Sequence, residues 1–209
     1  MEFILSPAET RVLGCLLEKQ ATTPDLYPLT LNYLTGACNQ KTSREPVMAL
    51  EEAEVAAAIV SLRKKNLAIE NKMHDSRVMK YSHNLGHLGS FTAKEQAALC
   101  LLLLRGAQTT GEIKGRSERM AQFESVPDAE AVLTGLGDKS CGAMVARLPR
   151  RSGEKEARWA QLLSGPLDLA AEAEAPAPKA GLSERVAALE AEVAALKEAL
   201  QKLSLPPAP

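Results

Sequence analysis

The side chains of this 209-residue chain that could perform catalysis are few and scattered. The four cysteines, Cys15, Cys38, Cys100 and Cys141, form no C-x-x-C pair and no zinc-ribbon spacing. Cys15 and Cys100 lie in strongly apolar stretches, so we interpret them as small buried hydrophobic residues. Cys38 is expected to face inward at the last turn of a helix. The thiols indicate packing rather than metal or redox chemistry.

Two histidines, His83 and His87, have the four-residue spacing of a helical metal site. Gly86 and Gly89 disfavour a helix there, and no carboxylate or cysteine in that segment completes a ligand set. We expect no metal and no cofactor.

Three carboxylates, Glu51, Glu52 and Glu54, are clustered at the start of a predicted helix. Acidic side chains at that position interact favourably with the helix macrodipole, which explains them better than acid/base catalysis does. The sequence contains no G-x-x-x-x-G-K-[ST], no G-x-G-x-x-G and no G-x-S-x-G motif. We therefore expect that the protein is not an enzyme and assign no catalytic residue.

The cationic side chains suit another chemistry, the neutralisation of nucleic-acid phosphates. Candidate contacts in the first half of the chain are Lys41, Ser43, Arg44, Arg63, Lys64, Lys72 and Arg77. Candidates in the second half are Lys114, Arg116, Arg119, Arg150, Arg151 and Lys155. Lys65, Lys80 and Arg147 are further cations of the same regions. The densest basic stretch, RLPRRSGEK (147–155), would suit phosphates at the tip of a hairpin.

The stretch ACNQKTSREPV (37–47) is the most polar one in an Ala- and Leu-rich region. Pro46 prevents a continuous helix and disfavours helical geometry at Glu45. Asn39 and Gln40 suit anchoring of the loop. Arg44 could bind a carboxylate inside the protein as readily as a phosphate, so the loop is either scaffold or contact surface.

The overall charge argues against a dedicated DNA-binding protein. The chain carries 25 Lys and Arg against 26 Asp and Glu, a formal net charge of −1, whereas phosphate neutralisation supplies most of the affinity of such proteins. Residues 91–165, with eleven Lys and Arg against nine Asp and Glu, are the most basic part. The predicted third helices also lack the Arg, Asn or Gln side chains that read base edges.

An internal repeat identifies the elements that position these side chains. Residues 6–19 (SPAETRVLGCLLEK) align with 92–105 (TAKEQAALCLLLLR), and both begin with a hydroxyl residue followed three positions later by Glu, a capping box. Further along, 54–65 matches 128–139, and the stretches containing Tyr81 and Trp159 match each other. Three matches in the same order indicate two copies of one unit.

Each unit has the pattern of three helices followed by a two-stranded hairpin, which is typical of a winged helix-turn-helix domain. The predicted helices cover residues 6–19, 29–40, 52–65, 92–105, 109–118 and 127–138, and the predicted strands 67–72, 77–83, 142–149 and 156–163. The expected fold class is α+β, mainly α with small β-hairpins, with tandem winged-helix domains over 1–88 and 89–165.

Four stretches carry a resemblance to a known family. They are LTLNYLTGACNQKTSREPVM (29–48), SRVMKYSH (76–83), LCLLLLRGAQTTGEIKGRSERM (99–120), and VARLPR followed by EARWAQLL (145–163). In these the chain resembles the YceH-type family of uncharacterised bacterial proteins, with CNQKTSREP as the most distinctive part. The resemblance covers about residues 6–163. It implies tandem winged-helix domains and supplies no activity.

The C-terminal tail has a different composition. Residues 166–181 read as an Ala/Pro/Glu-rich linker, and residues 182–204 as a coiled-coil helix. The a and d positions are Leu182, Val186, Leu189, Val193, Leu196, Leu200 and Leu203. The a positions are Val, Val and Leu, and every d position is Leu. β-branched residues at a with leucine at d favour a parallel two-stranded coiled coil, which predicts a homodimer. The alternative is an amphipathic helix that packs on its own domain.

Two functions follow from these patterns. The first is a DNA-binding transcriptional regulator that contacts double-stranded DNA with modest sequence preference. The second is a tandem winged-helix adaptor that binds a protein partner, similar to bacterial chromosome-partition adaptors. Cations on one continuous face would favour the first function, and scattered cations the second. With no leader and no apolar run long enough for a membrane, we expect a cytoplasmic protein.

Overall fold

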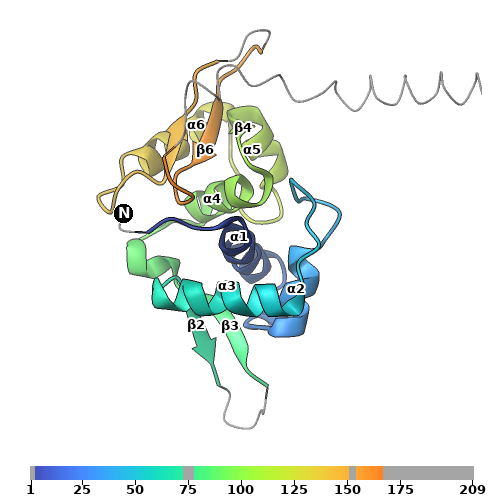
Figure 1. The fold of residues 1–209 in the computed structure, drawn as a ribbon. Coiled ribbons are helices and arrows are strands. Elements are labelled where there is room, and N and C mark those ends of the chain that lie inside the picture. Colours follow the sequence, from blue (N-terminus) through green and yellow to red (C-terminus); the bar gives the residue numbers. More distant parts are fainter. Residues whose placement is uncertain (1–2, 73–77, 151–153, 167–209) are drawn as a thin grey trace, which may run out of the picture.

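The computed structural model describes residues 3–72, 78–150 and 154–166, and they form two similar halves around a central pair of helices (Figure 1). The helices are α1 (Pro7–Thr22), α2 (Leu31–Cys38), α3 (Glu52–Lys64), α4 (Ala93–Arg105), α5 (Thr110–Arg116) and α6 (Val126–Gly137). The strands are β1 (Leu29–Thr30), β2 (Ala68–Asn71), β3 (Lys80–His83), β4 (Gln108–Thr109), β5 (Val145–Arg147) and β6 (Arg158–Gln161). The fold is α+β, as the sequence predicted.

The central pair consists of α1 and α4. Ser6 and Glu9 form the predicted capping box at the start of α1, with the Glu9 amide donating to the Ser6 hydroxyl at 3.2 Å and the Ser6 amide to the Glu9 carboxylate at 2.7 Å. Thr92 and Glu95 repeat this arrangement at the start of α4. Residues 12–17 and 97–104 are buried without interruption. Helices that are apolar all round must be enclosed, and here they pack on each other.

Each half contains a three-stranded antiparallel sheet, with strand orders β1-β3-β2 and β4-β6-β5. Tyr81 lies in the central strand of the first sheet and pairs with Leu29. Trp159 occupies the same position in the second sheet and pairs with Gln108. This common register confirms the alignment of Tyr81 with Trp159. The winged-helix assignment is an interpretation of this element order.

The second helix of each half is shorter than predicted. Helix α2 begins at Leu31 rather than residue 29, because Thr30 is its N-cap and accepts a hydrogen bond from the Tyr33 amide at 3.3 Å. Thr109 caps α5 in the same way. The residues before each helix pair with a hairpin as β1 and β4. Strands of two residues are too short to show an alternating pattern, so the sequence did not reveal them.

One hydrophobic core extends through both halves and includes Cys15, Cys38 and Cys100, which are buried as predicted. At its centre, α1 and α4 approach so closely that a Cβ atom added at Gly14 would lie 2.8 Å from Cδ2 of Leu104. The close approach of the two helices therefore requires a residue without a side chain at position 14.

The loop between α2 and α3 is fixed to both halves. The Asn39 side chain donates to the Leu50 carbonyl and accepts from the Leu50 amide, both at 2.8 Å, which confirms its anchoring role. The buried Arg11 guanidinium donates to the carbonyls of Cys38 at 2.9 Å and Pro46 at 2.6 Å. The loop also bonds to the second half, because the Glu45 amide donates to the α4 carbonyl of Leu104 at 2.8 Å.

The two ends of the described chain lie together. The Leu5 amide donates to the Leu163 carbonyl at 2.8 Å, and Leu5 is buried. The hydroxyls of Thr10 and Ser164 are 2.9 Å apart. The segment that precedes α1 is thus bonded to the end of the second half.

Several predicted features lie outside the described residues. They are the linker (166–181) beyond its first residue, the coiled coil (182–204) with all seven a and d residues, and the candidate contacts Arg77 and Arg151. Within the described ranges, each helix is either too short or too polar to cross a membrane.

Candidate nucleic-acid interface

Arg44 is a structural residue, which corrects its selection as a nucleic-acid contact. Its side chain has no exposed surface, and its guanidinium binds both carboxylate oxygens of Glu18, at 3.0 and 2.6 Å. It also donates to Gln40 and to the Ala37 and Ser43 carbonyls. Burial opposes the charge, but the bonded Glu18 carboxylate outweighs burial and raises the pKa of Arg44. No donor is left for a phosphate.

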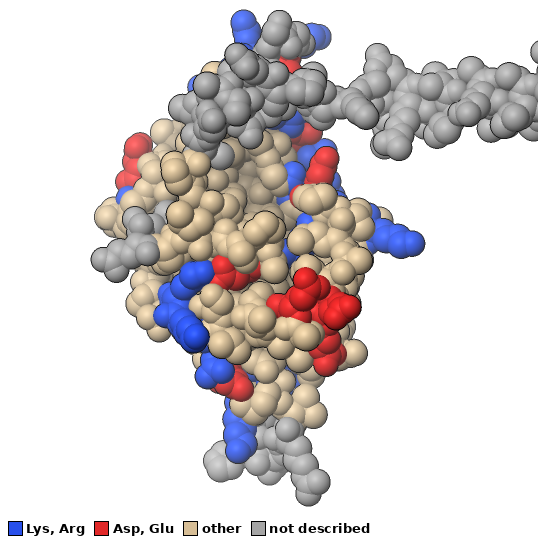
Figure 2. Space-filling view, viewed as in Figure 1, with Lys and Arg blue, Asp and Glu red and all other residues tan. Residues whose placement is uncertain are grey.

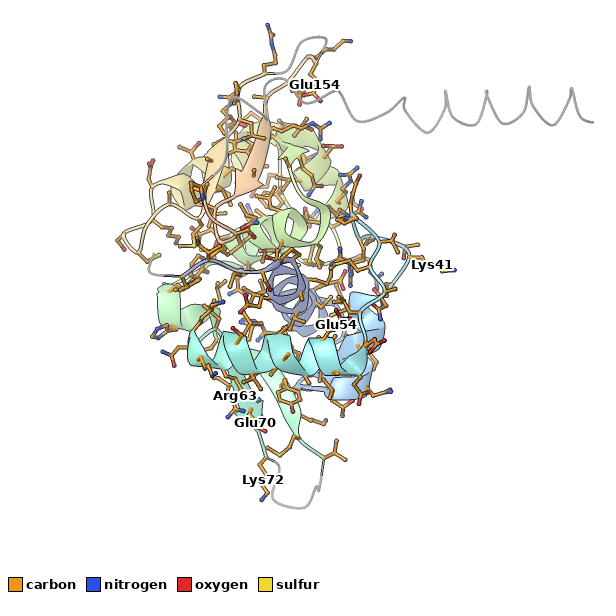
Figure 3. The ribbon with its side chains drawn as sticks, viewed as in Figure 1. Lys41, Glu54, Arg63, Glu70, Lys72 and Glu154 are labelled. Carbon is orange, nitrogen blue, oxygen red and sulfur yellow. The ribbon has the colours of Figure 1, made fainter. Side chains whose placement is uncertain are left out.

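The other described cations of the first half lie around α3 and the β2–β3 hairpin. Arg63, at the end of α3, forms an ion pair with Glu70 on β2. Lys64 and Lys72 are exposed and make no ion pair within the ranges that the structure describes. Figure 3 places Arg63 near the end of α3 and Lys72 toward the tip of the hairpin. These residues form the first-hairpin group: Arg63, Lys64 and Lys72.

The beginning of α3 carries the opposite charge. Glu51, Glu52 and Glu54 are exposed there, and Figure 2 shows acidic side chains gathered on this part of the surface. The Glu51 amide donates to the Glu54 carboxylate at 2.8 Å, so Glu54 satisfies a free donor of the helix start. Helix α3 is therefore acidic at its start and basic at its end, and its acidic start would repel a phosphate backbone.

The outward faces of α3 and α6 are small and mostly apolar. Ala53, Ala57 and Val60 are exposed along α3. The positions that the repeat aligns with them, Pro127, Ala131 and Thr134, are exposed along α6. Neither row presents an amide or guanidinium to a base edge. In both repeats this helix face has small side chains that would allow a partner to approach closely, and it offers few groups that could recognise DNA bases.

An open cleft beside the second hairpin gathers three cations. It has a volume of about 670 Å³ and lies between the start of α6 and the β5–β6 hairpin. Arg147, Arg150 and Lys155 line it and form the second-hairpin group, and the carboxylates of Glu130 and Glu156 line it as well. Arg147 lies 3.4 Å from a Glu130 carboxylate oxygen, whereas Arg150 and Lys155 are exposed and without an ion pair in the described part of the chain.

The remaining candidates lie elsewhere. Lys41, Ser43, Arg116 and Arg119 line a separate pocket between the halves, and Lys114 is on α5 outside that pocket. In Figure 3 Lys41 lies at the side of the molecule, away from both hairpins, and Glu54 lies between it and Arg63. Figure 1 shows the hairpins at opposite ends. The cations therefore form three separate groups rather than one continuous face.

No group of three or more His, Cys, Asp and Glu side chains within the described ranges could hold a metal ion. The Nδ1 atom of His83 accepts a hydrogen bond from the Leu85 amide at 3.2 Å, and its Nε2 atom contacts the Gln20 side chain. Burial lowers the pKa of His83 to about 4, so its imidazole is neutral at physiological pH.

Comparison with known proteins identifies relatives in several bacteria. Residues 5–154 match a family described as "Protein of unknown function, DUF480". The chain is 51% identical to a UPF0502 protein of Chromobacterium violaceum, over 92% of this chain and 87% of that protein. It is 49% identical to one of Geobacter sulfurreducens, over 94% and 91% of the two chains. A UPF0502 protein of Vibrio atlanticus is 44% identical over 97% and 96%.

The similarity extends beyond the resemblance seen in the sequence, which ended near residue 163. A match over 97% of 209 residues must include most of the segment after residue 166. The tail therefore belongs to the region of similarity with the Vibrio atlanticus protein and is not a separate addition.

Proposed function

The chain belongs to the DUF480 family, whose description assigns no activity, and we propose that it is a DNA-binding regulator whose second half contacts the phosphate backbone. We read both halves as winged-helix units, in which the third helix and the hairpin face the duplex. The observation that carries the proposal is the second-hairpin group of three cations beside the start of α6.

The second-hairpin cleft has two features that suit a phosphate. The α6 amide groups near Ser125 and Asp128 give the helix start a partial positive charge, since the macrodipole of a 12-residue helix points there. Arg150 and Lys155 add two charges that form no ion pair within the described ranges, and Arg147 adds one that Glu130 partly balances. The carboxylate of Glu156 also lines the cleft and reduces its net positive charge. A backbone phosphate at this position would meet donors from both the helix and the hairpin.

Binding of this kind carries little sequence information. The exposed row of α6, with Pro127, Ala131 and Thr134, offers one hydroxyl to the bases. Phosphate contacts fix orientation but do not distinguish base pairs. We therefore expect comparable affinities for unrelated duplexes, with specificity supplied by DNA shape or by a partner.

A second candidate function, the protein adaptor, is favoured by α3. Its exposed Val60 lies close to the exposed Ile69 of β2 in a shallow cleft, and its start carries the three exposed carboxylates. Arg63, Lys64 and Glu70 line the same cleft, so α3 presents its apolar pair beside a basic end, with an acidic start further along. A surface of mixed charge with exposed apolar side chains suits a protein partner better than it suits DNA. The separation of the cations into three groups, rather than one continuous face, also favours the adaptor.

The test is a salt titration of binding to a random-sequence duplex, followed by fluorescence anisotropy. Affinity should fall steeply with salt, because each phosphate contact releases counterions. Replacing Arg150 and Lys155 with alanine should weaken binding uniformly across sequences and reduce the slope of log K against log [salt] by about 2. Absence of binding at low salt would overturn the proposal in favour of the adaptor.

The matched control is the double variant Lys64→Ala/Lys72→Ala, which removes from the first half two exposed cations that form no ion pair within the described part of the chain. We expect its affinity and its salt slope to equal those of the unchanged protein. An equal loss in both double variants would mean that DNA contacts both halves, which would contradict the separate role of α3.

A further inference from the structure

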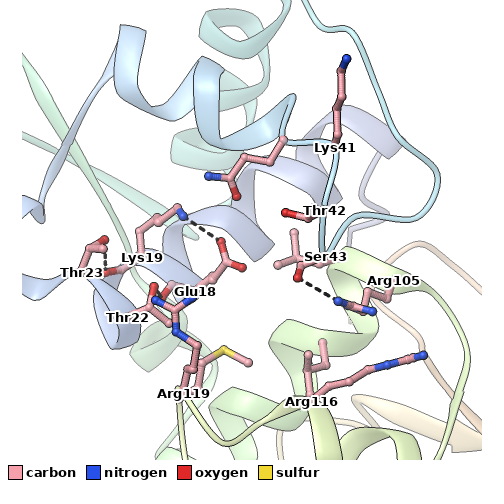
Figure 4. Close-up of a pocket in the computed structure, with 14 residues that line it drawn as sticks. Glu18, Lys19, Thr22, Thr23, Lys41, Thr42, Ser43, Arg105, Arg116 and Arg119 are labelled. Atoms are coloured by element: carbon pink, nitrogen blue, oxygen red, sulfur yellow. Dashed lines mark hydrogen bonds and ion pairs between the residues drawn. The ribbon is translucent and has the colours of Figure 1, made fainter.

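The pocket between the two halves is distinct from both hairpins and concentrates positive charge. It has a volume of about 400 Å³, within the range of small-molecule sites. The end of α1, the loop after α2, the end of α4 and the segment after α5 form its walls (Figure 4). Its cations are Lys19, Lys41, Arg105, Arg116 and Arg119, and its one carboxylate is that of Glu18.

The Glu18 carboxylate does not neutralise these cations. Both of its oxygens are bound by Arg44, which lies behind the pocket wall and brings a charge of its own. Lys19 is 3.4 Å from one of the same oxygens and is buried. Arg116 pairs with Glu112, so Lys41, Arg105 and Arg119 are the pocket cations that form no ion pair within the described ranges.

One buried donor of the pocket has no acceptor in the described part of the chain. The Nε atom of Arg105 is buried and has no hydrogen-bond partner among the described residues, while its Nη2 atom donates to the Ser43 hydroxyl at 2.8 Å. Burial, and then the neighbouring charge of Arg116, lowers the pKa of Arg105. A buried polar group without a partner is costly, so this guanidinium favours a nearby acceptor, although the Nε atom itself is closed to solvent.

Two further cations are available at the edge. Arg119 and Lys41 are exposed and have no ion pair within the described ranges. In Figure 4 Arg119 reaches toward Glu18 and Thr22, and Lys41 lies at the rim. Arg116 is less available, because it donates to Gln108 at 2.6 Å and lies 3.2 Å from a Glu112 oxygen.

We propose that this pocket binds a small phosphorylated molecule, with its phosphate group held by Arg105, Arg119 and Lys19 and covered by Lys41. Arginine-rich sites favour phosphate because the guanidinium donates two parallel hydrogen bonds to its oxygens. The side chains of Leu101, Leu104 and Met120 add apolar surface to the lining, which suits the non-phosphate part of such a molecule. Because both halves contribute cations, the ligand would connect them.

The internal repeat supports this site independently. Lys19 ends the repeated stretch of the first half, and Arg105 occupies the aligned position in the second half. Neither was selected from the sequence as a contact, because each lies in the last part of an apolar helix and has no basic neighbour. The feature of the sequence that could have indicated them is that Lys19 and Arg105 occupy the same position in the two repeats. Only the packing of α1 on α4 shows that the two positions line one pocket.

The test uses pyrophosphate and ADP as probes with the full-length protein in low-salt buffer. Isothermal titration calorimetry should give saturable binding, and the probes should raise the melting temperature above that in sodium chloride of equal ionic strength. The double variant Lys41→Ala/Arg119→Ala should weaken binding about tenfold or more. Both side chains are exposed and unpaired, so its melting temperature without ligand should be unchanged.

Two controls separate this site from the proposed DNA contact. Lys114→Ala removes an α5 cation that does not line the pocket, and Arg150→Ala/Lys155→Ala removes cations of the second hairpin. Neither should change probe binding. The proposal fails if neither probe binds at millimolar concentration, or if Lys114→Ala weakens binding as much as the pocket variant. It also fails if a random duplex displaces the probe, since the pocket would then hold a DNA phosphate.

Discussion

The Arg44 guanidinium is fully buried and uses its donors on Glu18, Gln40 and two backbone carbonyls. Removing it would leave the largely buried Glu18 carboxylate without its main partner. We expect Arg44→Ala to lower the free energy of unfolding by about 3–5 kcal/mol, as measured by urea denaturation. Arg63→Ala, which breaks the more exposed pair with Glu70, should cost about 1 kcal/mol or less. Similar costs for the two variants would contradict this assignment.

From the sequence, Arg44 could equally bind a carboxylate inside the protein or a phosphate of a ligand. Arg44 and Lys41 are cations of the same loop, and nothing in the residue order separates them. The difference arises from Glu18, 26 positions away, which Arg44 reaches because α1 runs beneath the loop. Long-range pairing of this kind leaves no local pattern, so candidate cations could be listed from the sequence but not sorted into scaffold and surface.

At the scale of elements, the contact of α1 with α4 depends on Gly14. We expect Gly14→Ala to lower the free energy of unfolding by about 1–3 kcal/mol, because the new Cβ would meet the buried Leu104 side chain and force the helices apart. Gly36→Ala is the matched control. No atom lies within 4 Å of a Cβ there, and alanine in α2 should stabilise the protein by about 0.5–1 kcal/mol. Equal effects in urea denaturation would be inconsistent with this packing.

Most helices and the hairpin strands could be predicted because their signals are local. Ser6 and Thr92 mark helix starts with Glu three residues later, and α3 and α6 carry apolar residues at helical spacing. The strands β1 and β4 could not be predicted, because a two-residue strand is defined only by its partner. The same limit applies to the pocket between the halves. Lys19 and Arg105 are 86 positions apart in the sequence and come together only because α1 packs on α4.

At the scale of the whole molecule, the sequence of the tail predicts self-association. The seven heptad residues lie outside the described ranges, so this prediction rests on the pattern of valine and leucine alone. Deleting residues 182–203 should reduce the mass measured by light scattering from dimer to monomer, because the a and d positions would form the interface. A dimer that persists after the deletion would place the interface on the two halves.

The bond between Leu5 and Leu163 has a consequence for how the two repeats are connected. Residues 3–5 lie beside residues 163–165, so the two ends of the described chain nearly meet. The halves are therefore connected twice, once by the covalent segment between β3 and α4 and once by the contact between these ends. A circular permutant, joined near Ser164 and opened near Ser90, would present the repeats in reverse order with the same contacts. The order of the two repeats along the chain would then be open to change without loss of the contacts between them.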